Sequence, residues 1–229
     1  IYTEITDSEN DARAKRITAY LNLVHDLVQE QTEMLYDPKN SIERNKYFEF
    51  LPDESELKIE YMKFISSQPN ELELENWLKT NIVIGSIDVN IMTKLDKENY
   101  SNKVKLDSEY NDAHAALRGF ANSKLKSSVV FSAGMNPRLF SYAENLVNLL
   151  PYGKESLNKK IILKVSDYRS ALIQGKFLAK KGLWVSEYRV ESGLNCGGHA
   201  FATEGYLMGP ILEEFKNNRE TLYSETRGA

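Results

Sequence analysis

KKIILKVS, residues 159–166, decides the fold class of this chain. Its apolar centre is what is expected of a strand covered on both faces. Other β-rich runs occur along the chain, and helical patterns lie between and after them. The runs are NIVIGSIDVNIM (81–92), SSVVFSA (127–133) and LWVSEYRV (183–190), and the helical patterns cover 109–125, 137–149, 168–181 and 206–222. This alternation predicts parallel strands joined by right-handed crossovers.

About four βα units can be counted in the second part of the chain. A closed βα barrel has eight strands and typically about 250 residues. We therefore predict an α/β fold with partial (β/α)8, TIM-barrel-like parallel units, and a small open sheet is the alternative. In the fourth run Val185, Glu187, Arg189 and Glu191 alternate with Trp184, Ser186, Tyr188 and Val190. This strict alternation predicts one polar face, suited to a barrel mouth or a sheet edge.

Residues 1–80 have a helical pattern instead. Apolar side chains recur at spacings of three and four between Ile17 and Leu35, which predicts one helix with a single apolar face, starting near Asp7 or Ser8. Shorter helices are predicted at 54–65 and 71–79, with a turn at 37–40. The expected organisation is a helical segment at 1–80, as an insertion or subdomain, followed by the βα units at 81–229.

Composition limits the classes of partner. The 229 residues carry a net charge of -4 without a basic block, which argues against nucleic acid. The sequence contains neither a membrane-spanning apolar run nor a signal peptide, and its single cysteine fits a reducing compartment, so we expect a cytoplasmic protein. Because the sequence begins at Ile1, we expect an internal piece of a longer protein.

In parallel α/β folds function lies at the carboxyl ends of the strands. This rule selects Asn90 and Met92 after the first run and Ser132–Asn136 after the second. The third run contributes Lys164, whose ammonium needs a carboxylate such as Asp167 or access to solvent. The fourth contributes residues 191–199. His114 falls early in a helical pattern, where we expect a surface or capping role.

The loop NCGGH, residues 195–199, leaves four interpretations open. Cys196 and His199 make a poor zinc site, so no metal is predicted. A thiol nucleophile with a histidine base is a second interpretation, although no orienting residue is evident from the spacing. A glycine-rich turn with a buried cysteine is the third. In the fourth, Gly197 and Gly198 let a flat cofactor ring approach and His199 acts on the substrate.

Together the four strand ends resemble those of a known family. DVNIMT (88–93), VVFSAGMNP (129–137), KKIILKVSD (159–167) and YRVESGLNCGGHAF (188–201) follow the order seen in the nitronate monooxygenase, or 2-nitropropane dioxygenase-like, family of FMN-dependent βα barrels. In that family successive strands end in "VN" and "SAG", carry "KV" and end in "E-x-GGH". The resemblance covers about residues 81–201, the central portion of such a barrel.

This resemblance implies an FMN-dependent oxidoreductase that acts on a small carbon acid such as a nitronate. His199 would remove a proton from the substrate carbon, with electrons passing to FMN and then to oxygen. Lys164 would lie at the pyrimidine edge of the flavin, where a cation stabilises the anionic reduced ring. The other implied cofactor-binding residues are Asn90, Met92, Ser132, Gly134, Glu191, Gly197 and Gly198.

The partners expected are a small-molecule substrate and either a second copy of the chain or the missing parts of the same chain. The alternative function is a non-catalytic α/β protein-interaction module without cofactor, which binds its partner through the helices around 17–35.

Overall fold

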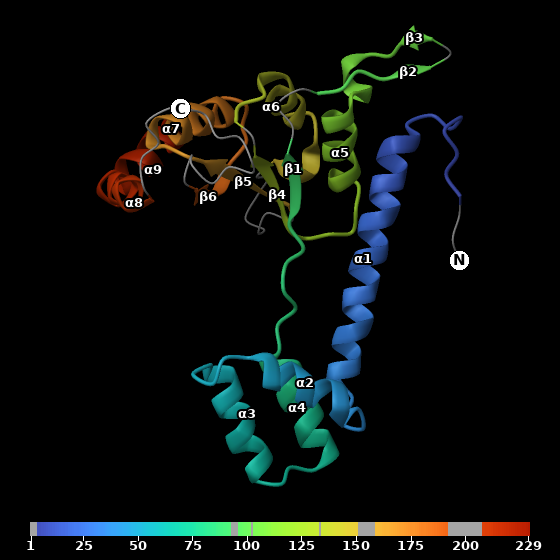
Figure 1. Cartoon of the computed structure of the whole chain (residues 1–229), viewed down its shortest axis with the longest axis vertical. Coiled ribbons are helices and arrows are strands. Elements are labelled where there is room, and N and C mark those ends of the chain that lie inside the picture. Colours follow the sequence, from blue (N-terminus) through green and yellow to red (C-terminus); the bar gives the residue numbers. More distant parts are fainter. Residues whose placement is uncertain (1–3, 93–95, 102, 133, 151–158, 192–207) are drawn as a thin grey trace. The chain divides into compact units, whose positions relative to one another are not determined.

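A computed structural model describes residues 4–92, 96–101, 103–132, 134–150, 159–191 and 208–229. The chain forms two compact units (Figure 1). The first combines Ile1–Leu21 with Ser86–Ala229, and the second is Asn22–Gly85. This division differs from the predicted one at residue 80, because the first part of the long helix α1 (Ala12–Tyr36) belongs with the sheet.

Four parallel strands form the main sheet, in the order β1-β4-β5-β6. They are β1 (Val89–Met92), β4 (Ser128–Ser132), β5 (Lys160–Val165) and β6 (Val185–Val190). β4 is buried at every residue, and β5 at all but its two lysines. The parallel pairing and the burial of the two central strands confirm the corresponding predictions.

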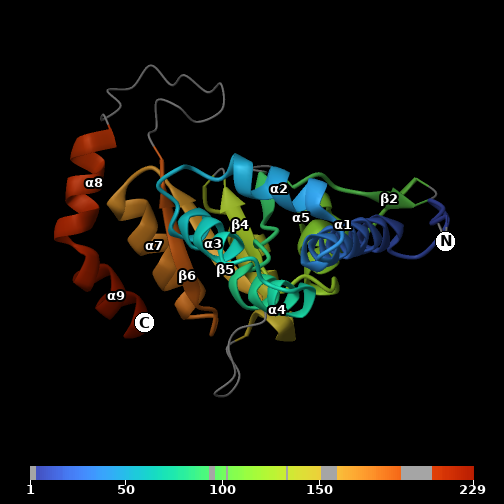
Figure 2. The same ribbon diagram turned by 90° about the horizontal axis from the view of Figure 1, so that it is seen from below.

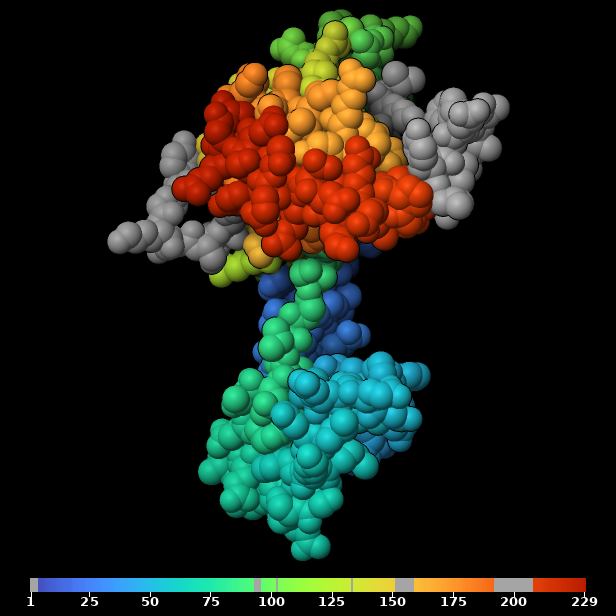
Figure 3. Space-filling model, turned by 90° about the vertical axis from the view of Figure 1, so that its left-hand side faces the viewer, coloured from blue at the N-terminus to red at the C-terminus, as the bar shows by residue number. Residues whose placement is uncertain are grey.

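Helices cover one face of this sheet. They are α5 (Asp112–Ala121), α6 (Pro137–Ala143) and α7 (Tyr168–Ala179), followed by α8 (Met208–Asn217) and α9 (Arg219–Arg227), with single 3-10 turns at Ser108–Tyr110 and Val147–Leu149. Their apolar side chains share one core with alternate strand residues, including Val129, Phe131, Ile161 and Leu163. α7 lies next to β6. α8 and α9 pack against α7 and cover its outer surface (Figures 2 and 3).

Local signals in the sequence explain where these helices begin. Asn136 caps α6 by accepting a hydrogen bond from the backbone N–H of Leu139, and Pro137 occupies the first helical position. Asp167 caps α7 in the same way, accepting from the N–H of Ser170 at 2.7 Å. The carboxylate predicted as a partner for Lys164 therefore serves the start of a helix instead.

Two sequence predictions about strands need correction, and one hairpin was not predicted. The run at 81–92 forms a strand only over Val89–Met92: Asn81 ends α4 (Glu71–Asn81), and residues 82–88 form neither helix nor strand. β6 does not alternate strictly: Ile161 pairs with Val185 and Ile162 with Glu187, so an extra residue bulges there. A short antiparallel hairpin, β2 (Tyr100–Ser101) with β3 (Val104–Lys105), had no predicted counterpart.

The second unit is a small helical cluster. It contains the end of α1 with α2 (Ser41–Phe50), α3 (Glu56–Ser66) and α4. Phe48 and Tyr61 stack at its centre with ring centroids 3.6 Å apart. The buried Arg44 donates to the Tyr61 hydroxyl and to backbone carbonyls of residues 37 and 38. The turn at 37–40 and the two shorter helices confirm the predictions, whereas α2 was not predicted.

Only part of the predicted apolar face of helix α1 is buried. Ile17 and Leu21 contact the core of the sheet unit, and Leu35 and Tyr36 contact the core of the helical unit. Tyr20, Leu27 and other apolar residues are exposed. The spacing of three and four predicts an apolar face on α1 that is wider than the part of the helix surface buried in either core.

Residues early in the chain are tied to α5, about 100 positions later. Arg118 makes two hydrogen bonds to the carboxylate of Asp11, with Nε 2.6 Å from Oδ2, and also donates to the Tyr142 hydroxyl. Ile17 packs against Gly119, where a Cβ would come within 2.8 Å of it. The glycine therefore lets α1 and α5 approach closely.

Gly175 of α7 provides a test of the packing of α9 against the sheet. A Cβ at this position would lie 2.2 Å from the Tyr188 hydroxyl and 2.8 Å from Cγ2 of Thr226. We expect Gly175→Ala to lower the free energy of unfolding by about 1–3 kcal/mol, because the inserted methyl overpacks this junction. Gly209→Ala is the matched control, since no atom lies within 4 Å of that Cβ. Equal urea midpoints for the two variants would contradict the packing described.

Lys159 gives the sheet unit a pH dependence. Its buried ammonium donates to the carbonyls of Ser123 and Leu125, and burial lowers its pKa from 10.5 to about 8. Between these values the unfolded chain binds more protons than the folded one, so the free energy of unfolding gains a contribution that rises with pH. We expect Lys159→Met to lose this contribution in urea titrations from pH 8 to 10.5, while the exposed Lys160→Met keeps it. Parallel pH profiles of Lys159→Met and the wild type would contradict it.

Candidate functional site

The carboxyl edge of the sheet brings together several of the predicted cofactor-binding residues. Ser132, which is buried, donates its hydroxyl hydrogen to Oδ1 of Asn90 on the neighbouring strand. The register of β4 and β5 places Ser132 beside Lys164 on the same face. Three polar side chains from three strands therefore lie on one face of the sheet, with Ser132 and Lys164 level at its carboxyl edge and Asn90 level with Val130 just before it.

Lys164 and Glu191 form an ion pair across β5 and the end of β6. Lys164 Nζ lies 2.6 Å from Glu191 Oε2, and both side chains are half-buried. The pair satisfies the requirement that an ammonium on a largely apolar strand find a carboxylate. Both residues belong to the set implied by the resemblance, but the predicted partner Asp167 is not the one used.

Met92 and Gly134 lie at the outer margin of this edge. The side chain of Met92 is exposed. Gly134 has a φ of +87°, and among the described residues no atom lies within 4 Å of a Cβ built on it. Both positions are therefore open on the side of the described residues. His199, Gly197, Gly198 and Cys196 lie outside the described residues.

An ion-pair network joins the two outer strands of the sheet on this same polar face. Arg189 of β6 donates from Nη2 to Asp88 Oδ2 at 2.7 Å and from Nε to Glu187 Oε1 at 2.6 Å. Asp88 directly precedes β1, and these hydrogen bonds raise the pKa of Arg189 above its usual value. Arg189 lies on the strand face predicted to be polar, but its partner Asp88 is 101 residues away in sequence and left no local signal.

This contact requires a strongly curved sheet. Three strand steps separate β1 from β6, about 14 Å in a flat sheet. The register also sets Arg189 level with Lys164, and so with Met92 rather than with Asp88. In a flat sheet Arg189 and Asp88 would be separated both by three strands and by several residues along the strand direction, so side chains perpendicular to the sheet could not meet. The polar face is therefore concave, and the helices lie on the convex face.

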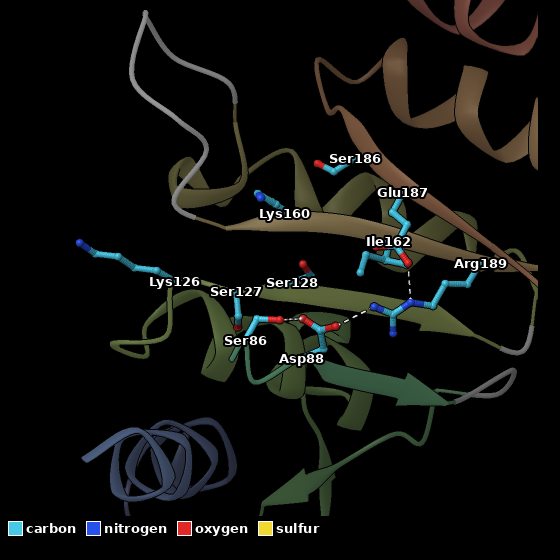
Figure 4. A pocket seen from close by; sticks show the side chains of 10 residues that line it. All are labelled: Ser86, Asp88, Lys126, Ser127, Ser128, Lys160, Ile162, Ser186, Glu187 and Arg189. Atoms are coloured by element: carbon cyan, nitrogen blue, oxygen red, sulfur yellow. Dashed lines mark hydrogen bonds and ion pairs between the residues drawn. The ribbon is translucent and has the colours of Figure 1, made fainter. Parts of the chain in front are cut away.

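A pocket of about 250 Å³ occupies the concave face near the amino ends of the strands (Figure 4). Hydroxyl groups and the Arg189 network line it, with Ile162 as its buried apolar floor. Lys126 also borders the pocket, but its side chain extends away from it in Figure 4. The pocket thus extends from the amino ends of β4 and β5 to Arg189, which the register sets level with the predicted site residue Lys164.

His114 is a buried residue rather than a surface one, which corrects the sequence prediction. Its Nδ1 shares a hydrogen bond with Asp96 Oδ2, and Asp96 Oδ1 accepts from the backbone N–H of Ala113 at 2.6 Å. The imidazole also contacts the Tyr142 ring, with centroids 4.9 Å apart. This pair fixes the segment after β1 to the start of α5. Spacing gave no signal for it, because the partners are 18 residues apart.

Within the residues that the structure describes, no group of three or more His, Cys, Asp or Glu side chains is placed to hold a metal ion. None of the described helices combines the length and the apolar character needed to cross a bilayer.

Comparison with protein-family models, with curated proteins and with solved structures finds no match to this chain.

Proposed function

We propose that the chain is part of an FMN-dependent oxidoreductase of the nitronate monooxygenase-like type, which oxidises a small carbon acid. One observation carries the proposal: Ser132 and Lys164 lie on one face at the carboxyl edge of neighbouring parallel strands, and Ser132 is hydrogen-bonded to Asn90 on the next strand. Parallel α/β folds place their ligands at this edge. The strand-end motifs that led to FMN therefore come from positions where a ligand is expected.

The curvature of the sheet supports a barrel wall as its architecture. The four strands are parallel and follow chain order, with helices on the convex face. The contact between Asp88 and Arg189 joins strands three steps apart with a staggered register. Closed barrels combine strand tilt with such a stagger, whereas flat open sheets do not. We therefore propose that these strands form about half of a (β/α)8 barrel, with the site on its concave side.

The described residues fit the chemistry of a flavin ring. Lys164 offers a cation, the Asn90 amide and the Ser132 hydroxyl offer hydrogen bonds, and the exposed Met92 offers apolar contact. Gly134 adds backbone that no side chain shields. FMN, when bound, would accept the electrons that leave the substrate carbon.

The candidate site residues would then have definite roles. Lys164 would hold the flavin ring by neutralising the negative charge that it gains on reduction, and Glu191, 2.6 Å from the lysine, positions it. Ser132 orients the amide of Asn90 by donating to its Oδ1, which leaves the amide N–H groups for the ligand. His199 takes the proton from the substrate carbon, a role suited to a side chain that titrates near neutral pH.

A non-catalytic interaction module is the second candidate function. It is favoured by the exposed apolar residues along α1, among them Tyr20 and Leu27. A protein that contains no flavin and takes up none would support this candidate.

The first test is the visible absorption spectrum of the purified full-length protein, with mass spectrometry of any ligand released by heat. We expect FMN, and we expect Lys164→Met to weaken its binding by about tenfold or more, because a hydrogen bond to a charged group is worth about 1.5–3 kcal/mol. Lys126→Met is the matched control and should bind normally, since its side chain is exposed and extends away from the pocket (Figure 4). Equal FMN affinities for the two variants would remove Lys164 from the site.

The second test concerns the base. We expect His199→Ala to retain FMN and to lose turnover of a nitronate by about 10²–10⁴-fold, the usual contribution of a general base. Cys196→Ser is the control, and its activity should be unchanged. Activity lost in Cys196→Ser but kept in His199→Ala would instead indicate a thiol enzyme.

A further inference from the structure

The pocket on the concave face lies wholly within the sheet unit. Its volume of about 250 Å³ has room for about eight water molecules, at about 30 Å³ each. Cationic and hydroxyl-bearing side chains of β4, β5 and β6 surround the buried Ile162, which forms its floor (Figure 4). The pocket is therefore polar around its walls, apolar at its floor and large enough for a small organic ion.

Lys160 provides this pocket with a cation that has no counter-ion. Side chains alternate along β5, so Lys160 lies on the concave face with Ile162. The register places it beside Ser128, whose hydroxyl is a second donor at the pocket. Among the described residues Lys160 takes part in no ion pair, because the carboxylates of this face are held by other cations. An ammonium group can only donate hydrogen bonds, so the free group of Lys160 suits an acceptor.

Arg189 is held across the same pocket by its ion pairs. Its Nε donates to Glu187 and its Nη2 donates to Asp88, which keeps the guanidinium in place on the concave face (Figure 4). Within the described part of the chain, no hydrogen bond uses its Nη1, so the N–H donors of that atom remain. The carboxylates of the pocket are thus occupied, whereas donors are left over. This imbalance favours a ligand that accepts hydrogen bonds.

We propose that this pocket is a phosphate-binding site. Ser128, Lys160 and Arg189 supply donors from three neighbouring strands, which suits a tetrahedral anion, because a phosphate group offers at least three oxygens and a carboxylate only two. The side chains that line the pocket include three cations and two carboxylates, so an anion meets a net positive charge. The volume beside Ile162 suits the short carbon chain of a small phosphate ester.

This site is distinct from the proposed flavin site. Lys160 and Lys164 lie on the same face of β5 but four residues apart, about 13 Å at 3.3 Å per residue. Lys164 is paired with Glu191, whereas the described residues leave Lys160 unpaired. The phosphate site needs only the four-stranded sheet, so it goes beyond the proposed oxidoreductase activity and does not depend on bound flavin.

Phosphorus NMR of inorganic phosphate, titrated with the full-length protein at constant ionic strength, tests this site. We expect saturable binding, and we expect Lys160→Met to weaken it by about tenfold or more, the usual loss when a hydrogen bond between charged groups is removed. Lys126→Met is the matched control: it also removes one positive charge from the lining, but its side chain extends away from the pocket (Figure 4). Both lysines are exposed, so neither substitution should unfold the sheet unit.

A second titration, with glycerol phosphate, distinguishes the sources of the phosphate group. Tighter binding of this ester than of inorganic phosphate would identify an organic phosphate as the ligand, and equal affinities would identify phosphate itself; both results support the site. Absence of saturable binding of either probe, or equal losses in Lys160→Met and Lys126→Met, would overturn it. FMN uptake is measured on the same variants and should be unchanged in Lys160→Met. If it falls in step with phosphate binding, the pocket holds the phosphate of FMN and a separate site is excluded.

Discussion

The chemistry of the sheet depends on the burial of alternate residues of its two central strands. Val129 and Phe131 of β4, and Ile161 and Leu163 of β5, must face the helices because they form the main core. Side chains alternate along a strand, so Ser132 and Lys164 are committed to the opposite, concave face. A register slip of one residue would exchange the two sets and bury the lysine among apolar side chains. Packing therefore determines which polar groups converge at the carboxyl edge.

The concave face is also where charges compensate one another. Lys164 and Arg189 are neighbours in the register of β5 and β6, and two like charges so close would repel. Glu191 pairs with the lysine, and Glu187 and Asp88 pair with the arginine. Each cation is thus held by carboxylates of its own face, which keeps Lys164 available at the edge of the sheet.

Much of the sheet could be predicted from the sequence because its signals are local. The apolar runs that became β4 and β5 and the Asn136–Pro137 start of α6 each lie within a few residues. Lys164 stood out because a charge interrupts an apolar run. The predictions that were wrong depend on partners distant in sequence. Lys164 pairs with Glu191 rather than with Asp167, and the buried His114 is hydrogen-bonded to Asp96. Periodicity measures the width of an apolar arc, so it could not divide the α1 residues between buried and exposed sides.

The link between Asp11 and Arg118 has a consequence for folding order. The helical unit is continuous in sequence, from Asn22 to Gly85, whereas the sheet unit needs residues from both sides of it. At about 5–20 residues per second, roughly 5–20 s of synthesis separate Asp11 from its partner in α5. We therefore expect the helical unit to fold on the emerging chain first, while the first turns of α1 wait for α5. Closing the sheet unit costs more loop-closure entropy than closing the helical unit. The folding rate of the sheet unit should therefore depend more strongly than that of the helical unit on the contact between Ile17 and Gly119.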